Sequence, residues 1–210
     1  MAWADRTLRE FQDALASSEP TPGGGSAAGV ALGQAAALSV MVSELTLGKE
    51  SYSVGWEVSQ QIKELATPLL DLGLELAQKD SEAFDAVVAS FRLPKQTEEE
   101  KDVRRQTIRT ATLGAAEVPF QTAIKSLELL KLLPKLAEKG NPNAISDVGV
   151  ASLLASAALK GGVFNVEINL ESLPDSYGEN MRSMLPRIVE DGRVFSRQCM
   201  DAVRMRLSDQ

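Results

Sequence analysis

Apolar and polar residues alternate along most of the chain with the period of amphipathic helices. From Val58 to Leu76 the apolar positions return at alternating gaps of four and three residues, the spacing of one helix face, and Pro68 is predicted to kink this helix. Similar patterns predict helices over residues 7–16, 27–47, 148–160 and 186–207, and from the charged stretch 93–106 to about residue 132. The pattern predicts an all-α fold, a single-domain bundle of long helices over residues 1–210.

The stretch over residues 163–170 is ambiguous. Gly161 and Gly162 are predicted to interrupt the preceding helix, and the apolar-polar alternation that follows them suits a strand with Asn165 and Asn169 on one face. As a helix, the same stretch also places Asn165 and Asn169 together, one turn apart. Periodicity alone leaves both interpretations open.

A turn without bulky side chains precedes the helix predicted over residues 27–47. It reads "EPTPGGGSAAGVALG" over residues 19–33, with Ser26 as the predicted N-cap of the helix. The free amides of Gly23, Gly24 and Gly25, at the positive end of a helix, can hold an anionic or carbonyl group of a flat ligand. A turn that serves only packing is the alternative. A dinucleotide-binding loop is excluded because no hydrophobic strand precedes the glycines.

The helix after this turn is predicted to be buried. Gly25, Gly29, Gly33 and Ala37 recur every four residues and form a smooth stripe, against which another helix can pack with its backbone very near. The apolar run over residues 27–42 is shorter than a membrane span and contains a glutamine. We therefore expect no membrane partner.

Composition excludes several classes of partner. The chain has 22 Lys and Arg against 29 Asp and Glu, a formal net charge of −7, so we expect no nucleic acid and no anionic membrane surface among its partners. The single cysteine, Cys199, excludes an intrachain disulfide and suits a reducing cytosol. The first 15 residues contain no apolar core typical of a signal peptide. A cytoplasmic protein is predicted.

The chain contains no histidine, which restricts its acid-base chemistry. Proton transfer near neutral pH must use a carboxylate, Lys, Tyr, Cys199 or water, and a Ser-His-Asp triad is impossible. A zinc site would lack its commonest ligand. Asp80 falls on the apolar stripe that continues from Leu76, whereas Asp85 points elsewhere on the same predicted helix. A carboxylate on a buried stripe is costly unless it is paired or used, so Asp80 is the candidate acid-base group.

Five segments, in chain order, together resemble the formiminotetrahydrofolate cyclodeaminase and methenyltetrahydrofolate cyclohydrolase family. They are "TPGGGSAA" (21–28), "LTLGKESY" (45–52), "DSEAFDAVVASFRLPK" (80–95), "GNPNAISDVGVASLLASAAL" (140–159) and "NVEINL" (165–170). The resemblance implies an all-helical homodimer that acts on a tetrahydrofolate one-carbon substrate without a metal or redox cofactor. It also favours the helical interpretation of residues 163–170.

The resemblance implies a set of site residues. The family's polar positions fall here on Lys49, Asp80, Lys95, Asn141, Ser146, Asp147, Asn165 and Asn169. Asp80 is expected to be catalytic, with Asp147 as the second acid or as the group that orients the pterin. The remaining six, together with Gly23, Gly24, Gly25 and Ser26, are expected to bind substrate. The segment after Lys49, Glu50-Ser51, is less basic than the family pattern, so this stretch is less suited to binding the glutamate tail of the folate.

Helix geometry constrains how these residues meet. Asp147 and Asn165 are 18 residues apart, so an unbroken helix would place them on one face but roughly 27 Å from each other. Either Gly161-Gly162 breaks the helix, or its two ends serve different parts of the ligand or different subunits. A site near a dimer interface is the favoured arrangement.

Two folate reactions and one non-catalytic role are consistent with the sequence. Hydrolysis of 5,10-methenyltetrahydrofolate to 10-formyltetrahydrofolate is favoured, because the chain lacks the formiminotransferase domain to which some family members are fused. Closure of 5-formiminotetrahydrofolate to the methenyl compound with release of ammonia is the alternative. A folate-binding or helical interaction module without turnover is more remote, since Asp80 and Asp147 are both present.

Overall fold

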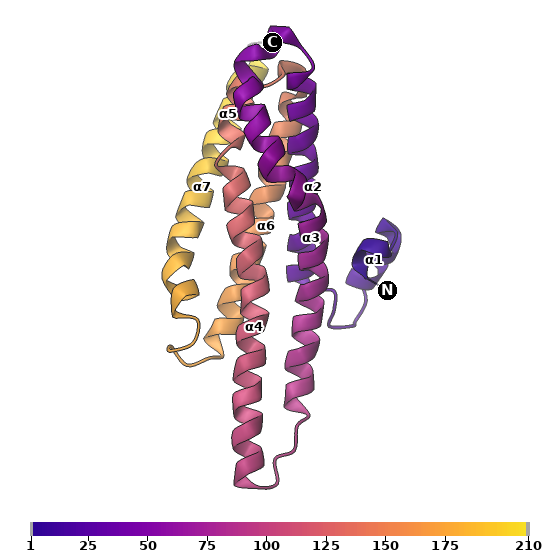
Figure 1. Ribbon diagram of the computed structural model, residues 1–210, viewed down its shortest axis with the longest axis vertical. Coiled ribbons are helices and arrows are strands. Elements are labelled where there is room, and N and C mark those ends of the chain that lie inside the picture. The colour runs from indigo at the N-terminus through magenta and orange to yellow at the C-terminus, as the bar shows by residue number, and fades with distance from the viewer. Residues whose placement is uncertain (1, 209–210) are drawn as a thin grey trace.

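The computed structural model describes residues 2–208 as a bundle of long helices joined by short turns (Figure 1). Within those residues there is no β-strand, so the all-α prediction is confirmed. In chain order the elements are η1 (Trp3–Asp5), α1 (Leu8–Leu15), α2 (Gly24–Leu47), η2 (Glu50–Gly55), α3 (Trp56–Phe91), α4 (Glu98–Leu130), α5 (Leu133–Lys139), η3 (Pro142–Ala144), α6 (Ile145–Glu171) and α7 (Glu179–Ser208).

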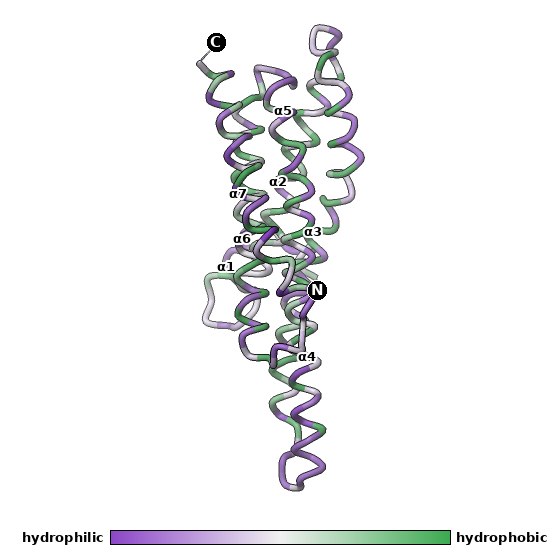
Figure 2. The backbone as a smooth tube through the Cα atoms, turned by 90° about the vertical axis from the view of Figure 1, so that its left-hand side faces the viewer, coloured by the Kyte–Doolittle hydropathy of each residue, from purple (hydrophilic) through white to green (hydrophobic). Residues whose placement is uncertain are grey.

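The long helices are arranged in two layers. α2 packs on α3 and α6, and α4 packs on α3 and α6, so that α2 and α6 lie behind α3 and α4 in Figure 1. α7 covers one side of α6 and α5, whereas α1 stands outside the bundle beside α3. The hydrophobic core between the layers consists almost entirely of Ala, Leu, Val and Ile, and several buried Ser and Thr side chains lie among them. The α3–α4 hairpin extends beyond the other helices and ends in a hydrophilic tip (Figure 2).

Local sequence fixes the starts of two helices. Thr7 accepts a hydrogen bond from the Glu10 backbone N–H, and the Glu10 carboxylate accepts one from the Thr7 N–H in return. Thr97 and Glu100 form the same reciprocal pair at the start of α4. Each capping box satisfies N–H groups that the first helical turn leaves free.

Several predicted boundaries are wrong, and the clearest case is α6. The predicted interruption at Gly161-Gly162 is absent, because α6 continues unbroken from Ile145 to Glu171. Of the two interpretations of residues 163–170, the helical one, which the resemblance favours, is confirmed. The glycine serves packing instead: a Cβ atom at Gly162 would lie 2.6 Å from the Pro119 carbonyl oxygen on α4. α7 starts at Glu179 rather than Pro186, and α5 was not predicted.

Helices α2 and α3 approach each other closely at their glycines. A Cβ atom at Gly73 would lie 2.7 Å from both the Gly29 oxygen and the Gly33 nitrogen, so bare backbone touches bare backbone. Gly29 and Gly33 are therefore part of a packing stripe, as predicted. Because α2 and α3 are locked together along this contact, the first turn of α2 is held against the middle of α3.

Two helices resemble membrane spans by length and composition alone. They are α2 and the segment Pro142–Glu171, and 39% and 50% of their most apolar windows are buried in the bundle. A core helix of a soluble protein meets the same criterion, so this observation is weak evidence for a membrane. Both helices also carry exposed apolar residues, namely Met41 and Leu45 on α2 and Val150, Leu153, Phe164 and Ile168 on α6.

We predict that Gly73→Ala lowers the free energy of unfolding by about 1–3 kcal/mol, because the added methyl group forces the two backbones apart. The matched control is Gly114→Ala on α4, where a Cβ atom would meet no atom within 4 Å. That variant should be more stable by about 0.5–1 kcal/mol, since alanine favours a helix interior. Urea denaturation of both variants checks the pair, and a Gly73→Ala protein as stable as wild type would contradict it.

Candidate active site at the start of helix α2

The side chain of Asp80 lies against the first turn of α2. Asp80 is on α3, and its carboxylate occupies the space that a side chain at Gly25 would fill: a Cβ atom there would be 2.0 Å from Oδ1. The carboxylate borders a cavity of about 180 Å³. Its lining comes from the glycine turn, α3, α4 and α6, namely Pro20, Thr21, Gly23, Gly24, Gly25, Asp80, Phe84, Ala115, Asn165 and Asn169.

Two opposing effects act on the Asp80 carboxyl. Burial raises the pKa of Asp80 above its ordinary value, because the charged form loses solvation. Hydrogen bonds from Ser26 oppose this rise: the Ser26 hydroxyl donates to Oδ2 at 3.0 Å, and the Ser26 backbone N–H also favours the carboxylate. The positive end of α2 acts in the same direction as Ser26. A carboxyl held between these effects can both accept and return a proton.

Ser26 was predicted to be the N-cap of α2, and that prediction is wrong. The N-cap is Gly23, which has no side chain to offer the helix, and Ser26 lies inside the first turn. Its fully buried hydroxyl instead points at Asp80 on another helix. The Asp80 carboxylate therefore does for α2 what an N-cap side chain usually does, because it places a negative charge beside the free N–H groups of the first turn.

Asn165 and Asn169, two of the predicted site residues, line the cavity from α6. Asn165 Nδ2 donates to the Gly161 carbonyl oxygen at 2.8 Å, and Asn169 Nδ2 donates to the Asn165 and Ala115 oxygens at 2.8 and 3.2 Å. Because a carbonyl oxygen only accepts, these bonds fix the orientation of both amides. Their side-chain oxygens are left to accept hydrogen bonds from a ligand with N–H groups.

The other predicted residues lie elsewhere in the chain. Asn141 is at the opposite end of the bundle, where its side chain donates to the Leu45 oxygen and accepts from the Asn143 N–H, a structural role. Lys49 is exposed at that same end, with its ammonium 5.6 Å from the Tyr52 ring centre. Lys95 is exposed beyond the end of α3, more than about 17 Å of helix rise from Asp80.

Asp147 and Ser146 occupy the first turn of α6, far from Asn165. Since α6 is unbroken, the 18 residues between Asp147 and Asn165 correspond to about 27 Å. Asp147 is also the acidic residue of a first helical turn, where it favours the helix without any ligand. Within one chain, therefore, Asp80 and Asp147 belong to two polar clusters at opposite ends of the bundle.

Four cavity residues were not predicted from the sequence, namely Pro20 and Thr21 in the turn before α2, Phe84 on α3 and Ala115 on α4. Phe84 lies one turn after Asp80 on α3, and the Ala115 carbonyl oxygen accepts from Asn169. Four-residue spacing from Asp80 could have identified Phe84, whereas nothing in the sequence marks Ala115.

Cys199 is not a suitable proton carrier, because it is buried on α7 and burial raises the pKa of its thiol to about 11.

Known proteins share both this sequence and this fold. The family model described as formiminotransferase-cyclodeaminase matches residues 7–187. The chain belongs to this family. A methenyltetrahydrofolate cyclohydrolase of Methylorubrum extorquens is 36% identical over 97% of this chain and 99% of its own length. The formimidoyltransferase-cyclodeaminase of Gallus gallus is 31% identical over 90% of this chain, which spans 35% of that relative.

A solved structure of another family member has the same fold. It is a formiminotetrahydrofolate cyclodeaminase from Thermotoga maritima, with a TM-score of 0.79 and 30% sequence identity, matched over 98% of both chains. The resemblance inferred from the five sequence segments is confirmed. The family includes both a cyclohydrolase and a cyclodeaminase of this chain's length, so length alone does not distinguish the two reactions.

We predict that Gly25→Ala displaces the Asp80 side chain from the first turn of α2, because the methyl group and Oδ1 cannot occupy the same space. The displaced carboxyl should gain solvent, so that its pKa, measured by carbon NMR, falls toward the ordinary value of 3.8. Gly33→Ala, on the same helix, is the control, since its Cβ atom would meet the nearest atom at 3.5 Å. An unchanged Asp80 pKa in Gly25→Ala would contradict the prediction.

We predict that Asp80→Asn stabilises the fold at neutral pH. The pKa of Asp80 is raised in the folded state, so the folded chain binds the extra proton and stability falls as pH rises from the ordinary value of 3.8 through the raised value. The variant lacks this loss, so its advantage should be full above the raised pKa and should vanish below 3.8. Urea denaturation across pH tests this. The prediction would be refuted if the free energy of unfolding of the variant, minus that of wild type, were smaller at neutral pH than in acid.

Proposed function

We propose that the protein is a methenyltetrahydrofolate cyclohydrolase. The observation that carries the proposal is the partly buried Asp80 carboxyl beside the glycine turn, in a chain without histidine whose relative at 36% identity, matched over its whole length, has that name. The reaction moves protons and transfers no electrons, and the methenyl carbon is itself the electrophile. We therefore propose that no metal or redox cofactor takes part.

Asp80 performs both proton transfers in this proposal. Its carboxylate accepts a proton from the water that attacks the methenyl carbon, which forms the C–O bond. It then returns that proton to N5 while the bond between N5 and the carbon breaks, and the hydroxyl proton of the adduct leaves to solvent. The products are 10-formyltetrahydrofolate and one proton. A pKa raised by burial brings Asp80 closer to neutral pH, where one group can serve in both directions.

The two asparagines and the glycine turn bind the pterin in this proposal. The free oxygens of Asn165 and Asn169 accept hydrogen bonds from the amino and ring N–H groups of the pterin edge. The N–H groups of the Gly23–Gly25 turn remain available to a carbonyl oxygen. Phe84, half-exposed at the cavity wall, supplies an apolar surface for a flat ring.

Cyclodeaminase activity is the second candidate, because the matched Thermotoga maritima structure is a formiminotetrahydrofolate cyclodeaminase. In that reaction N10 attacks the carbon of the protonated formimino group, whose nitrogen carries two hydrogens. Asp80 accepts the N10 proton and passes it to that nitrogen, which leaves as ammonia as the methenyl cation forms. Both reactions place the same carbon beside Asp80. Only the identity of the nucleophile and of the leaving group differs between them.

We further propose that the active form is a homodimer joined through the exposed faces of α2 and α6. On α6 the exposed positions recur every three or four residues and, apart from Lys160, carry no charge between Ser146 and Phe164. Phe164 and Ile168 are each 67% exposed and Leu153 is 55% exposed. Two copies of such a face can pack on each other about a twofold axis.

The dimer would also complete the site. A cavity of about 180 Å³ is smaller than the ~300–1,000 Å³ that usually encloses a drug-sized ligand, so one chain holds only part of a folate. If two α6 helices meet antiparallel about an axis near residue 156, Asp147 of the partner subunit lies level with Asn165. The folate of one chain would then be within reach of Asp147, Ser146 and Lys49 of the other chain.

We also propose a cytoplasmic location for the protein.

The reaction is tested with purified protein and the methenyl chromophore. Loss of the chromophore faster than in buffer supports the cyclohydrolase. Its appearance from 5-formiminotetrahydrofolate, with release of ammonia, supports the cyclodeaminase instead. Binding of tetrahydrofolate without either reaction would overturn the enzyme assignment in favour of a binding module.

We predict that Asp80→Asn lowers turnover by at least about a hundredfold with only a modest change in substrate binding, since the amide cannot exchange the proton. Asp85→Asn, an exposed position on the same helix, is the matched control and should turn over at the wild-type rate. A near-normal rate for Asp80→Asn would remove Asp80 from the mechanism.

We predict that a mixture of Asp80→Asn and Asp147→Asn subunits regains about a quarter of wild-type activity after joint refolding, whereas each variant alone is impaired. Half of the dimers should be mixed, and each mixed dimer would contain one site with both aspartates intact. Leu153→Glu should prevent recovery, because it places a charge in the dimer face. A mixture no more active than the separate variants would show that the two aspartates do not share a site across subunits.

A further inference from the structure

Three hydrogen bonds link Asp80 to the first residues of the chain. Trp3 Nε1 donates to Ser81 Oγ at 3.0 Å, Ser81 Oγ and Ser26 Oγ are 3.1 Å apart, and Ser26 Oγ donates to Asp80 Oδ2 at 3.0 Å. Both serines are buried, so neither hydroxyl has bulk water as a partner. The chain of hydrogen bonds crosses from η1 to α3, then to α2, and returns to α3.

The chemistry of the two ends fixes the direction of the chain. An indole N–H only donates, so Ser81 accepts from Trp3. A carboxylate only accepts, so the single proton of the Ser26 hydroxyl is used on Asp80. The remaining bond must therefore run from the Ser81 hydroxyl to the Ser26 oxygen. With Asp80 ionised, every donor in the relay points toward its carboxylate, and each bond polarises the next.

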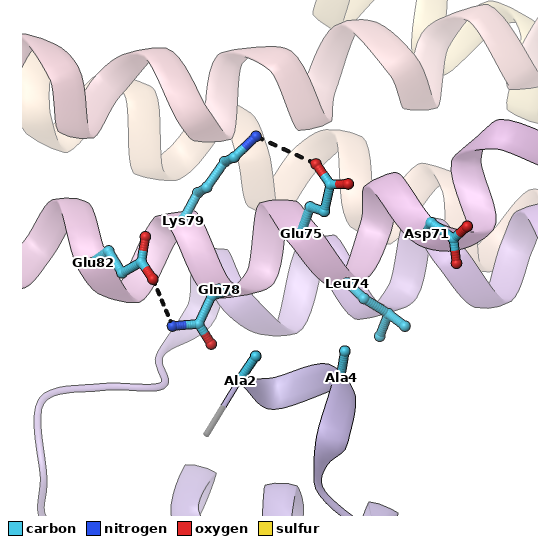
Figure 3. A pocket seen from close by; sticks show the side chains of 8 residues that line it. All are labelled: Ala2, Ala4, Asp71, Leu74, Glu75, Gln78, Lys79 and Glu82. Atoms are coloured by element: carbon cyan, nitrogen blue, oxygen red, sulfur yellow. Dashed lines mark hydrogen bonds and ion pairs between the residues drawn. The ribbon is translucent and has the colours of Figure 1, made fainter.

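The segment that carries Trp3 is docked on α3 by contacts of its own. The Trp3 backbone N–H donates to Gln78 Oε1 at 2.9 Å, and the Gln78 amide nitrogen donates to Glu82 at 2.9 Å, which orients the Gln78 oxygen toward η1. The Trp3 ring also meets the Phe11 ring edge to face, with 5.7 Å between ring centres. Figure 3 shows Ala2 and Ala4 of this segment lying over Leu74 and Gln78.

We propose that Trp3 and Ser81 are positioning residues for Asp80, and that residues 2–6 form a strap that sets the reactivity of the carboxylate from outside the active site. This inference rests on the proposed acid-base role of Asp80. Neither Trp3 nor Ser81 lines the cavity, so neither touches substrate there. The relay holds Oδ2 through Ser26 and leaves Oδ1, which lies over Gly25, to meet the reacting water or nitrogen.

The relay controls the pKa of Asp80 as well as its orientation. The causes that act on this pKa are burial, which raises it, and the hydrogen bonds from Ser26, which lower it. Asp80 is the one titratable group among the residues that line the cavity. Without the Trp3 N–H, Ser81 is free to turn its proton elsewhere, and the Ser26 hydroxyl becomes a weaker donor to Oδ2. The pKa of Asp80 should then rise further.

The test uses Trp3→Phe, which keeps an aromatic ring against Phe11 and removes the N–H, and Ser81→Ala, which breaks the relay in the middle. Each should lower kcat about tenfold with KM nearly unchanged, the effect of weakening one hydrogen bond to a charged group. The acid limb of the kcat/KM profile should move to higher pH, because the basic form of Asp80 appears later. Ser90→Ala, another buried serine of α3 whose hydroxyl donates to the Val87 oxygen, is the matched control and should leave both quantities unchanged.

Two further measurements separate the relay from simple loss of packing. The double variant Trp3→Phe/Ser81→Ala should be no slower than the slower single variant, because both substitutions interrupt one chain of hydrogen bonds. The pKa of Asp80, followed by carbon NMR without any substrate, should rise in both single variants. That readout remains valid if the protein turns over neither folate. An unchanged Asp80 pKa, or rate losses that multiply in the double variant, would overturn the proposal.

Discussion

The contact between the Asp80 carboxylate and the bare first turn of α2 is the constraint on which the site depends. A partly buried carboxylate is unfavourable without compensation, and here the compensation comes from Ser26 and the positive end of a helix. Both need the carboxylate to approach closer than any Cβ atom allows, which is why Gly25 stands at that position. The interlocked backbones of Gly29 and Gly73 hold the two helices in that register.

Much of the fold follows from local patterns in the sequence, and the errors occur where a distant partner decides. The four-three spacing of apolar residues and the capping boxes at Thr7 and Thr97 are local and mark real helices. The local pattern predicts Gly162 as a helix breaker, because its real function, contact with the Pro119 carbonyl oxygen, depends on a helix some forty residues earlier. The pattern predicts Ser26 as a cap for the same reason, since its partner Asp80 lies on another helix.

The site was predictable to a similar extent. Asp80 could be found because a carboxylate on an apolar stripe contradicts its surroundings, and the resemblance added Asn165 and Asn169, which do face it. The contributions of Trp3 and Ser81 could not be found, since the hydrogen bond between them joins residues 78 positions apart. Such a bond leaves no periodicity in the sequence. Local patterns identify Asp80 as a carboxylate in an apolar setting, whereas the residues that hydrogen-bond to it, directly or through Ser26, are visible only in the folded structure.

One geometric fact connects the remaining observations about α6. As a continuous helix it separates Asp147 from Asn165 by about 27 Å, yet it displays exposed apolar residues along the whole interval. By length and composition, α2 and the segment Pro142–Glu171 also resemble membrane spans. A second copy packed antiparallel on this face would account for all three features, because it covers the apolar residues and brings the far polar cluster of one chain beside the Asp80 cavity of the other. In that arrangement each α6 contributes to two sites, because its Asn165 lies at the cavity of its own chain and its Asp147 at the cavity of the partner.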